Sequence, residues 1–402
     1  MDGSAGTGPQ VTARPSAEAG RSLDGALGLI EEIAAEPRRP CSEAELEASL
    51  RLRAWLEASG VEAHLEAFPS YPSFGAPYGL LLALATSPLL LAPRRRALRA
   101  SLSVAAALGA WLEGDFRRIS PGRLFERRTS RNLVAGIEPA GSARRTLCLM
   151  CHVDSSRSGL MFHPSVTPRL GGILRVVGAA LGAGALAPVL ERRRAGRAVL
   201  GWSRAILAAA GFLVAERELR GVDVPGANDN ASGAAAVAVL GAELASSPAQ
   251  ETRVVLLITG SEEANVLGAR AFLEAHDTRD WLFLNFDGVG APASLHFLLR
   301  EGGAAAQWEA DQRLVAVAES VAARRPDLRL TGTTRSSGLP YDSTPVLARG
   351  GRALTLTVQN GSIPNYHWPT DTPDRIDPEV LGRALEAGRE MIAAIDRGEA
   401  DL

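Results

Sequence analysis

The stretch that decides the fold is residues 225–263, which read PGANDNASGAAAVAVLGAELASSPAQETRVVLLITGSEE. It opens on a turn of glycine and short polar residues, and the small residues over 232–244 predict a helix. The segment 254–259 is short, apolar and uninterrupted, as in a strand that is buried on both faces. A turn, a helix and a buried strand in this order indicate one unit of an α/β domain.

The same alternation of elements continues on both sides of this stretch. Five further helices are expected: at 23–35, 42–59, 311–323 and 378–395, and a short one that follows Leu267. Ser42 begins a capping box at the start of the second. Seven further strands are expected at 61–68, 132–137, 146–151, 281–286, 294–299, 328–332 and 353–358. Strands that alternate with helices form a mostly parallel sheet covered on both faces. We therefore expect a three-layer α/β/α fold with a central mixed, mostly parallel sheet.

The composition excludes several classes of protein. With 402 residues, 46% of them hydrophobic and 22% charged, the chain can bury a large core. The formal net charge of −2 lacks the basic excess that nucleic-acid binding requires, so no nucleic-acid partner is expected. Three cysteines are too few for a disulfide scaffold, and Cys148 and Cys151 fall on opposite faces of a strand, which favours two core residues. Residues 1–22 lack the features of a signal peptide, so we expect a disordered tail followed by one domain over 23–402.

Acidic and imidazole side chains gather where the predicted strands end. Seven such residues lie just after a strand, at a helix start or in a following loop: His152, Asp154, Asp229, Glu262, Glu263, Asp287 and His367. Because ligand sites in such sheets lie at the carboxyl ends of the strands, we expect these side chains to converge on one edge. Imidazole and carboxylate groups are the ligands that zinc-like cations bind. Each residue alone would be more simply structural, but the set in this order predicts a metal centre.

Two metal ions distribute these ligands evenly. His152 and Asp287 would hold one ion, Glu263 and His367 the other, and Asp229 would bridge the two. Each ion then has three protein ligands, and a position remains for a bridging water. Two close metal ions acidify such a water and stabilise the oxyanion of amide hydrolysis.

Other residues are expected to serve this centre without binding metal. Glu262, adjacent to a ligand, suits the general base, and Asp154 suits a partner that orients the His152 imidazole. Four residues are candidates to line the pocket: Tyr341, Asp342, His163 and Tyr366. For Asp342 an ordinary turn residue is an equal alternative, and we interpret Asp371 and Asp374 as helix-approach and capping groups.

Five segments together resemble peptidase family M28 in order and spacing. They read HVDS at 152–155, PGANDNASG at 225–233, SEE at 261–263, NFDGVG at 285–290 and HWPTDTPD at 367–374. This is the co-catalytic zinc aminopeptidase family, whose wider group includes glutaminyl cyclases and glutamate carboxypeptidase-like proteins. The resemblance, over about 27–59 and 131–395, implies a zinc-aminopeptidase-like (phosphorylase/hydrolase-like) fold and two Zn²⁺ per chain held as above. It also implies a cis peptide between Asp229 and Asn230, and an exopeptidase that removes N-terminal residues from peptide substrates.

Two alternative functions belong to different classes. A glutaminyl-cyclase-like acyltransferase is disfavoured because His152 offers a ligand for a second metal and Asp229 lies in the peptidase-like segment. A catalytically inactive binding protein on the same fold would be expected to lack Glu262 or a ligand, and none is missing.

Two apolar insertions interrupt the α/β pattern, at about 71–123 and 156–222. Each has an apolar segment, an arginine-rich turn and a second apolar segment, which predicts helical hairpins at 71–115 and 170–216. One interpretation is a cap of four packed helices on a soluble cytoplasmic protein; the other is membrane association with arginines at the headgroups. Only 68–92 reaches the roughly 20 apolar residues of a spanning helix, and Pro88 interrupts it; the other segments are short or carry Arg175 or Arg204. We favour membrane association, and if both hairpins span the bilayer, both chain ends stay on one side.

Overall fold

An eight-stranded sheet forms the centre of the fold, in the order β1-β2-β4-β3-β5-β10-β6-β9. The computed structural model describes residues 17–117, 120–303, 306–335 and 338–401. The strands are β1 (Ala63–Ser70), β2 (Arg128–Ile137), β3 (Arg145–His152), β4 (Thr252–Thr259), β5 (Leu282–Phe286), β6 (Ser294–Leu298), β9 (Thr331–Thr333) and β10 (Arg352–Gln359). The central strands β4, β3, β5 and β10 run parallel to one another. Strand β2 pairs antiparallel with β1 and β4, and β6 pairs antiparallel with β10 but parallel with β9. The predicted mixed, mostly parallel sheet is confirmed.

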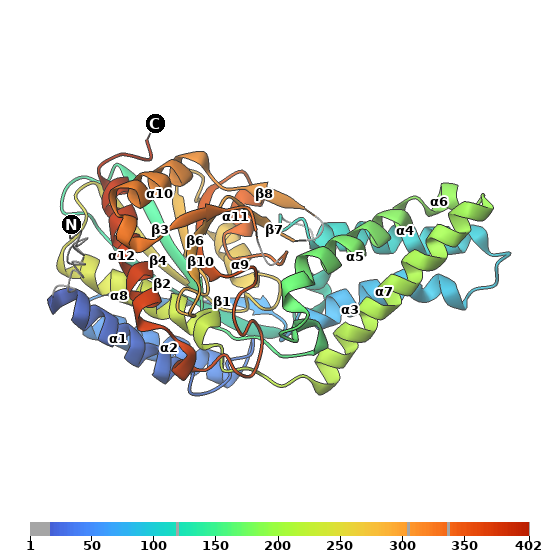
Figure 1. Cartoon of the computed structure of the whole chain (residues 1–402), viewed down its shortest axis with the longest axis horizontal. Coiled ribbons are helices and arrows are strands. Elements are labelled where there is room, and N and C mark those ends of the chain that lie inside the picture. The colour runs from blue at the N-terminus through green and yellow to red at the C-terminus, as the bar shows by residue number, and fades with distance from the viewer. Residues whose placement is uncertain (1–16, 118–119, 304–305, 336–337, 402) are drawn as a thin grey trace, which may run out of the picture.

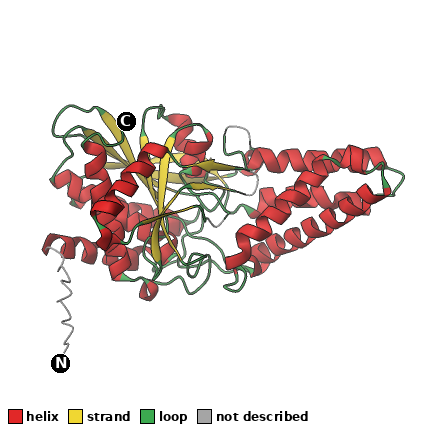
Figure 2. Ribbon diagram, turned by 45° about the horizontal axis from the view of Figure 1, so that its top comes forward, coloured by secondary structure: helices red, strands yellow, loops and turns green. Residues whose placement is uncertain are grey.

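Helices cover both faces of this sheet, as Figure 2 shows by colour. One face packs against α1 (Ala17–Ile33), α2 (Glu43–Ala58), α8 (Ser232–Ser246), α10 (Gln312–Arg324) and α12 (Pro378–Asp396), and the other against α9 (Leu267–Ala275) and α11 (Thr344–Ala348). Cys151 belongs to the first of these two cores and Cys148 to the second. The two thiols therefore lie on opposite faces of β3, as the strand alternation predicted.

Two details at the amino end differ from expectation. Helix α1 begins at Ala17, so the last residues of the expected tail are helical, while residues 1–16 lie outside the described part of the chain. Ser42 caps α2 by accepting a hydrogen bond from the Glu45 amide at 3.1 Å. The Glu45 carboxylate, however, accepts from the amide of Cys41 at 2.8 Å, because the Ser42 amide already donates to Arg39.

The register of the parallel strands brings their carboxyl ends level with one another. His152, the last residue of β3, pairs with Thr259, the last residue of β4. On the other side β5 ends at Phe286, which pairs with Leu356 of β10. The loops that leave β3, β4, β5 and β10 therefore start from one edge of the sheet, where side chains from four segments can meet.

The two insertions form a single four-helix arm that projects from this edge (Figure 1). Its elements are α3 (Gly75–Thr86), η1 (Ser87–Leu90), α4 (Arg96–Glu113), α5 (Leu170–Ala185), α6 (Ala187–Leu190) and α7 (Arg194–Arg220). Helix α3 packs on α4 and α7, and α5 packs on the same two helices. The two arginine turns lie at the far end of the arm, beside α6 in Figure 1.

The lengths of the arm helices correct one expectation. The apolar segment 68–92 is not one helix, because Phe68 belongs to β1 and α3 ends at Thr86, next to Pro88. Instead α7, with 27 residues, is the helix in the described part of the chain that is long and apolar enough to cross a membrane. Arg204, the charged residue of its apolar segment 198–215, is buried and donates to Glu191 at 2.9 Å. The charge inside α7 is therefore paired within the bundle.

Candidate metal centre

Two groups of potential ligands meet at the carboxyl edge of the sheet. In the first, His152 Nε2 lies 3.2 Å from Asp229 Oδ1 and 3.6 Å from Asp287 Oδ2. In the second, His367 Nε2 lies 3.1 Å from both Asp229 Oδ2 and Glu263 Oε1. All five side chains are buried. The structure thus brings together the five predicted ligands.

The donor atoms of each group suit a shared cation. In each group the ligand atoms lie within 4.8 Å of one another, and Asp229 gives one carboxylate oxygen to each group. Within the described residues, Asp229 Oδ2 and Glu263 Oε1 accept no hydrogen bond of good geometry although His367 Nε2 is close. Buried carboxylate oxygens that lie close to an imidazole nitrogen but accept no hydrogen bond from it need another partner. Two neighbouring metal ions that share Asp229 would supply that partner.

The electrostatics of the site show how strongly these groups affect one another. Burial acts to lower the pKa of both imidazoles, but nearby carboxylates outweigh it, so that the pKa of His152 is well above its usual value and that of His367 is about 9. Burial also acts to raise the pKa of Asp229, but the two imidazoles hold it well below its usual value. Burial raises the pKa of Glu262 and of Asp287 well above the ordinary range. Dense buried negative charge of this kind is what bound cations would stabilise.

Asp154 contacts both the His152 imidazole and the acidic pair formed by Glu262 and Glu263. His152 Nδ1 lies 3.0 Å from the backbone oxygen of Asp154, which fixes the ring so that Nε2 faces the ligand group. The Asp154 carboxylate accepts hydrogen bonds from the amides of Glu262 and Glu263, both at 3.0 Å. Asp154 therefore orients the imidazole through its main chain, and its side chain holds the acidic pair.

The polar residues of the turn that carries Asp229 connect it to the loop after β5. Asn228 Oδ1 accepts from the amide of Gly290 at 2.9 Å, and Asn230 Oδ1 accepts from Gly288 at 3.1 Å and from Gly233 at 3.0 Å. A Cβ at Gly233 would collide with Asn230 Oδ1. These contacts explain why asparagines and a glycine stand at these positions. The peptide bond between Asp229 and Asn230 is cis, as the resemblance implied.

Asp371 has a different position from the one expected. It is buried rather than a helix-approach group, and its carboxylate accepts from the amides of Asn228 at 2.8 Å and Asp229 at 3.0 Å. Burial raises the pKa of Asp371 to about 7. The residue that caps α12 is Asp377, which accepts from the Glu379 amide. Asp371 thus holds the bridging ligand in place.

Arg38 is a further residue of the site that was not predicted from the sequence. This buried side chain donates to the backbone oxygens of Val153 at 2.8 Å, Pro225 at 2.6 Å and Gly226 at 2.9 Å, and so joins the loop after β3 to the Asp229 turn. It also donates to the backbone oxygen of Ile33 in α1 at 2.9 Å. Burial lowers the pKa of Arg38 to about 10. No sequence signal marks it, because its partners are carbonyl oxygens of distant segments.

Replacing Arg38 by methionine is expected to destabilise the fold by about 3 kcal/mol or more, because several buried carbonyl oxygens lose their donor. Denaturant unfolding of the full chain measures this. The matched control is Arg39→Met, because the Arg39 side chain is partly exposed and, among the described residues, forms its one ion pair with Asp223, at 4.0 Å. That control should change stability by at most about 1 kcal/mol. Equal stabilities of the two variants would contradict the joining role of Arg38.

One of the four pocket candidates lines a cavity beside the ligands. The cavity has a volume of about 700 Å³ and begins at Glu262, Glu263, Tyr366 and His367. The Tyr366 ring stacks on that of His367 with 3.9 Å between centroids. The Phe162 ring packs edge-on against the same imidazole at 4.3 Å and lies 5.9 Å from the Tyr366 ring. Phe162 is a second residue that the sequence did not single out.

The other three candidates lie elsewhere. Asp342 is fully buried and accepts from Thr259 Oγ1 at 2.7 Å, and burial raises its pKa to about 7. Tyr341 is buried and is not among the cavity-lining residues. His163 is exposed, with its ring 5.2 Å from that of Trp368. Two residues near His163 in the sequence, Met161 and Val166, line the cavity instead.

Comparison with known sequences gives two matches. Residues 213–392 match peptidase family M28. The chain is also 26% identical over 189 residues to the probable lipoprotein aminopeptidase LpqL of Mycobacterium tuberculosis, which covers 39% of this chain. That match spans only 37% of the length of the relative.

Comparison with solved structures establishes the fold. A zinc aminopeptidase of Bacillus subtilis superposes with a TM-score of 0.56 at 13% identity, covering 93% of this chain and 95% of that one. A glutaminyl cyclase of Bacteroides thetaiotaomicron bound to N-acetylhistamine superposes with a TM-score of 0.53 at 15% identity, covering 92% and 97%. At these identities the likeness is one of architecture, and it includes both enzyme classes that the sequence suggested.

Proposed function

Because residues 213–392 match peptidase family M28, we propose that this protein is a zinc-dependent exopeptidase that removes N-terminal residues from peptides. The observation that carries the proposal is the pair of ligand groups that share Asp229. His152 and Asp287 would hold one zinc ion, Glu263 and His367 the other. When bound, the ions would acidify a water molecule and polarise the scissile carbonyl group.

The residues of the chain supply the proton transfers. Glu262 lines the cavity and is not needed in either ligand group, so its carboxylate is free to take a proton from the attacking water. The water oxygen bonds to the carbonyl carbon, the C–N bond breaks, and Glu262 passes the proton to the leaving nitrogen. The products are a carboxylate and an amine. The Asp154 carboxylate holds the acidic pair in position by accepting hydrogen bonds from the backbone amides of Glu262 and Glu263.

A peptide with an N-terminal glutamine tests this function against the cyclase alternative. Release of free glutamine is expected, because the first ligand group is complete and can support a second metal ion. Release of ammonia with an intact, cyclised peptide would show a glutaminyl cyclase instead. A panel of aminoacyl anilides measured on the same preparation shows which N-terminal residues are accepted.

We also propose that the arm inserts into a membrane. Of the 18 large apolar side chains that are exposed in the described part of the chain, 14 lie within 75–113 and 170–220, that is, on the arm. Exposed apolar patches of this extent are rare on soluble monomers. The match to a protein named as a lipoprotein aminopeptidase also supports a site at a membrane.

The distribution of charge on the arm favours spanning over lying flat. Segments 75–90, 100–112 and 176–190 contain no charged residue, and 198–215 contains only the buried Arg204. Arginine-rich turns bound this belt at the tip. Exposed apolar residues occur on all four long helices, as in Leu80, Trp111, Val176 and Trp202, whereas a helix that lies on a membrane is apolar on one face only. The belt of α7 is 18 residues, about 27 Å at 1.5 Å per residue, close to the bilayer core.

The membrane proposal predicts that the full chain is recovered with membranes and resists a high-salt wash, because apolar burial is not screened by salt. Replacing Trp202 and Phe212 by glutamate should release or destabilise the arm, at a cost of about 2.5–3.5 kcal/mol per charge at the bilayer centre. The control is Leu50→Glu on α2, an exposed apolar residue of the α/β domain outside the arm. A wild-type chain that is monodisperse without detergent would contradict the proposal and favour a soluble cap.

A further inference from the structure

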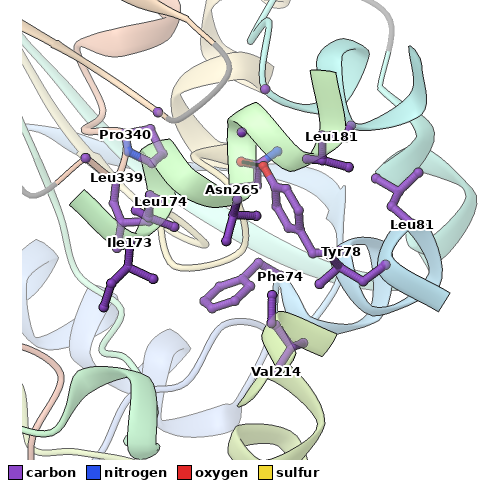
Figure 3. Close-up of a pocket in the computed structure, with 18 of the residues that line it drawn as sticks. Phe74, Tyr78, Leu81, Ile173, Leu174, Leu181, Val214, Asn265, Leu339 and Pro340 are labelled. Atoms are coloured by element: carbon purple, nitrogen blue, oxygen red, sulfur yellow. Dashed lines mark hydrogen bonds between the residues drawn. The ribbon is translucent and has the colours of Figure 1, made fainter. Parts of the chain in front are cut away.

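The cavity at the metal centre continues far into the arm. Its lining follows α5 from Leu170 to Ala185, a distance of about 22 Å at 1.5 Å per residue. The facing walls come from α3, α4 and α7, and Figure 3 shows Phe74 and Tyr78 between Leu174 and Leu81. Its volume of about 700 Å³ is typical of a site for a whole ligand rather than for one side chain.

The two ends of the cavity differ in chemistry. The carboxylates and the imidazole of the lining, Glu262, Glu263 and His367, lie at the metal centre. Among the described lining residues of the arm helices, two carry a polar side-chain group: Tyr78, whose hydroxyl donates to Asn265 Oδ1 at 3.4 Å, and Trp111, whose indole is 49% exposed at the side of the arm. An extended peptide in the arm would bury backbone amides and carbonyls without partners. A hydrocarbon chain has no such groups and loses nothing there.

Small residues create the space that a chain would occupy. Ala107 and Ala110 of α4 face the cavity, as do Gly178 and Gly182 of α5. A Cβ at Gly182 would meet no atom within 4 Å. Small residues at several positions on two helices therefore leave this space open, and larger side chains at these positions would narrow it.

The cavity is open along the side of the arm. Among the described lining residues, the exposed large side chains are Leu108 and Trp111 of α4 and Ile173 of α5, with 53%, 49% and 38% of their surface exposed. These two helices are neighbours, so the opening lies between them and within the uncharged belt. In a bilayer this opening faces lipid chains, which are roughly parallel to the helices.

We propose that the substrate is an amphiphilic amide with a long hydrocarbon chain that enters sideways between α4 and α5. Its amide lies at Glu262 and the metal ligands, and its chain lies along α5 toward Ala185. The inference rests on the proposed amide hydrolysis for its chemistry, and the cavity supplies the substrate class. Two sources share this chemistry: a fatty-acyl amide, and a peptide whose N-terminal residue carries a lipid chain.

Substrate series of increasing chain length test the hydrolysis, using the full chain in phosphatidylcholine vesicles. One series consists of unbranched alkanoyl anilides from acetyl to hexadecanoyl, and the other of the same anilides with an α-amino group. The value of kcat/KM should rise by about fourfold per methylene until the chain fills the cavity. Preference for the first series identifies a fatty-acyl amide, and preference for the second identifies a lipid-bearing N-terminus. A value that is flat in both series while short aminoacyl anilides are cleaved would overturn the inference and leave the peptidase function standing.

A binding measurement separates the inference from the proposed function. A long-chain fatty amide that carries a diazirine near its end is photo-crosslinked to the Glu262→Gln chain, in which turnover is expected to be about 10²–10⁴-fold slower, and the sites are mapped by mass spectrometry. Labels at Leu108 or Leu181, displaced by excess long-chain but not by short-chain amide, support the cavity as the site even if no hydrolysis is found. Labels confined to outward residues such as Trp202 would overturn it.

Variants that fill the cavity complete the test. Gly182→Trp and Ala107→Trp should each lower the ratio of long-chain to short-chain kcat/KM by about 60-fold, fourfold for each of three excluded methylenes. The matched control is Gly172→Trp on the same helix, where a Cβ also meets nothing within 4 Å but the residue does not line the cavity. Metal content and melting temperature of all three variants confirm that they fold. An unchanged ratio in both cavity variants would contradict the placement of the chain.

Discussion

Glutamine in place of Glu262 is expected to lower kcat by about 10²–10⁴-fold while both metal ions stay bound. The amide side chain keeps the size of the carboxylate but cannot accept the proton of the attacking water. Glu262 belongs to neither ligand group, and its backbone N–H, not its side chain, donates the hydrogen bond to the Asp154 carboxylate, so the substitution leaves the ligands in place. Steady-state kinetics together with elemental analysis of the same sample give both quantities.

The adjacent residue provides the matched comparison. Glu263→Gln alters a carboxylate that faces His367 at 3.1 Å, so this variant should lose metal as well as activity. The two glutamates are adjacent in the chain and both are buried, and the backbone amide of each donates to the same Asp154 carboxylate. A Glu262→Gln chain that turns over near the wild-type rate with both ions bound would contradict the role of base.

Removal of the bridging ligand is expected to have the second large effect. Asp229→Ala should reduce metal content from two ions per chain to none, because this carboxylate belongs to both ligand groups. His367→Ala should lose one ion, since it takes part in the second group alone. Loss of the metal ions removes several kcal/mol of transition-state stabilisation, so activity should fall by about 10⁴-fold or more. Chelation of the wild-type chain should have the same effect, and zinc should restore activity.

Elemental analysis after gel filtration checks the stoichiometry. Asp374→Asn is the control, because Asp374 is an exposed acid in the loop that follows His367 and contacts neither ligand group. Its metal content and activity should match those of the wild-type chain. One ion per chain in the fully active protein, or retention of both ions by Asp229→Ala, would contradict the two-metal arrangement.

The sequence by itself determined the sheet, its helices and the candidate ligands that meet at the edge of the sheet. These features are local: a buried strand is an apolar segment, and a ligand that follows a strand lies at the sheet edge wherever that strand is placed. For this reason His152, Glu263 and Asp287 could be assigned from their positions after 146–151, 254–259 and 281–286, and the structure brings them together.

Only the tertiary structure decided how the ligands are held and what lies beside them. Arg38 and Asp371 act on backbone atoms of remote segments, and a backbone amide or carbonyl leaves no trace in the sequence of its partner. The cavity is the space that four helices leave between them, and the apolar pattern of α5 is the same whether its small residues meet a neighbour or a void. The sequence therefore predicted two apolar hairpins, whereas their packing around a continuous cavity depends on distances between helices that no single segment encodes.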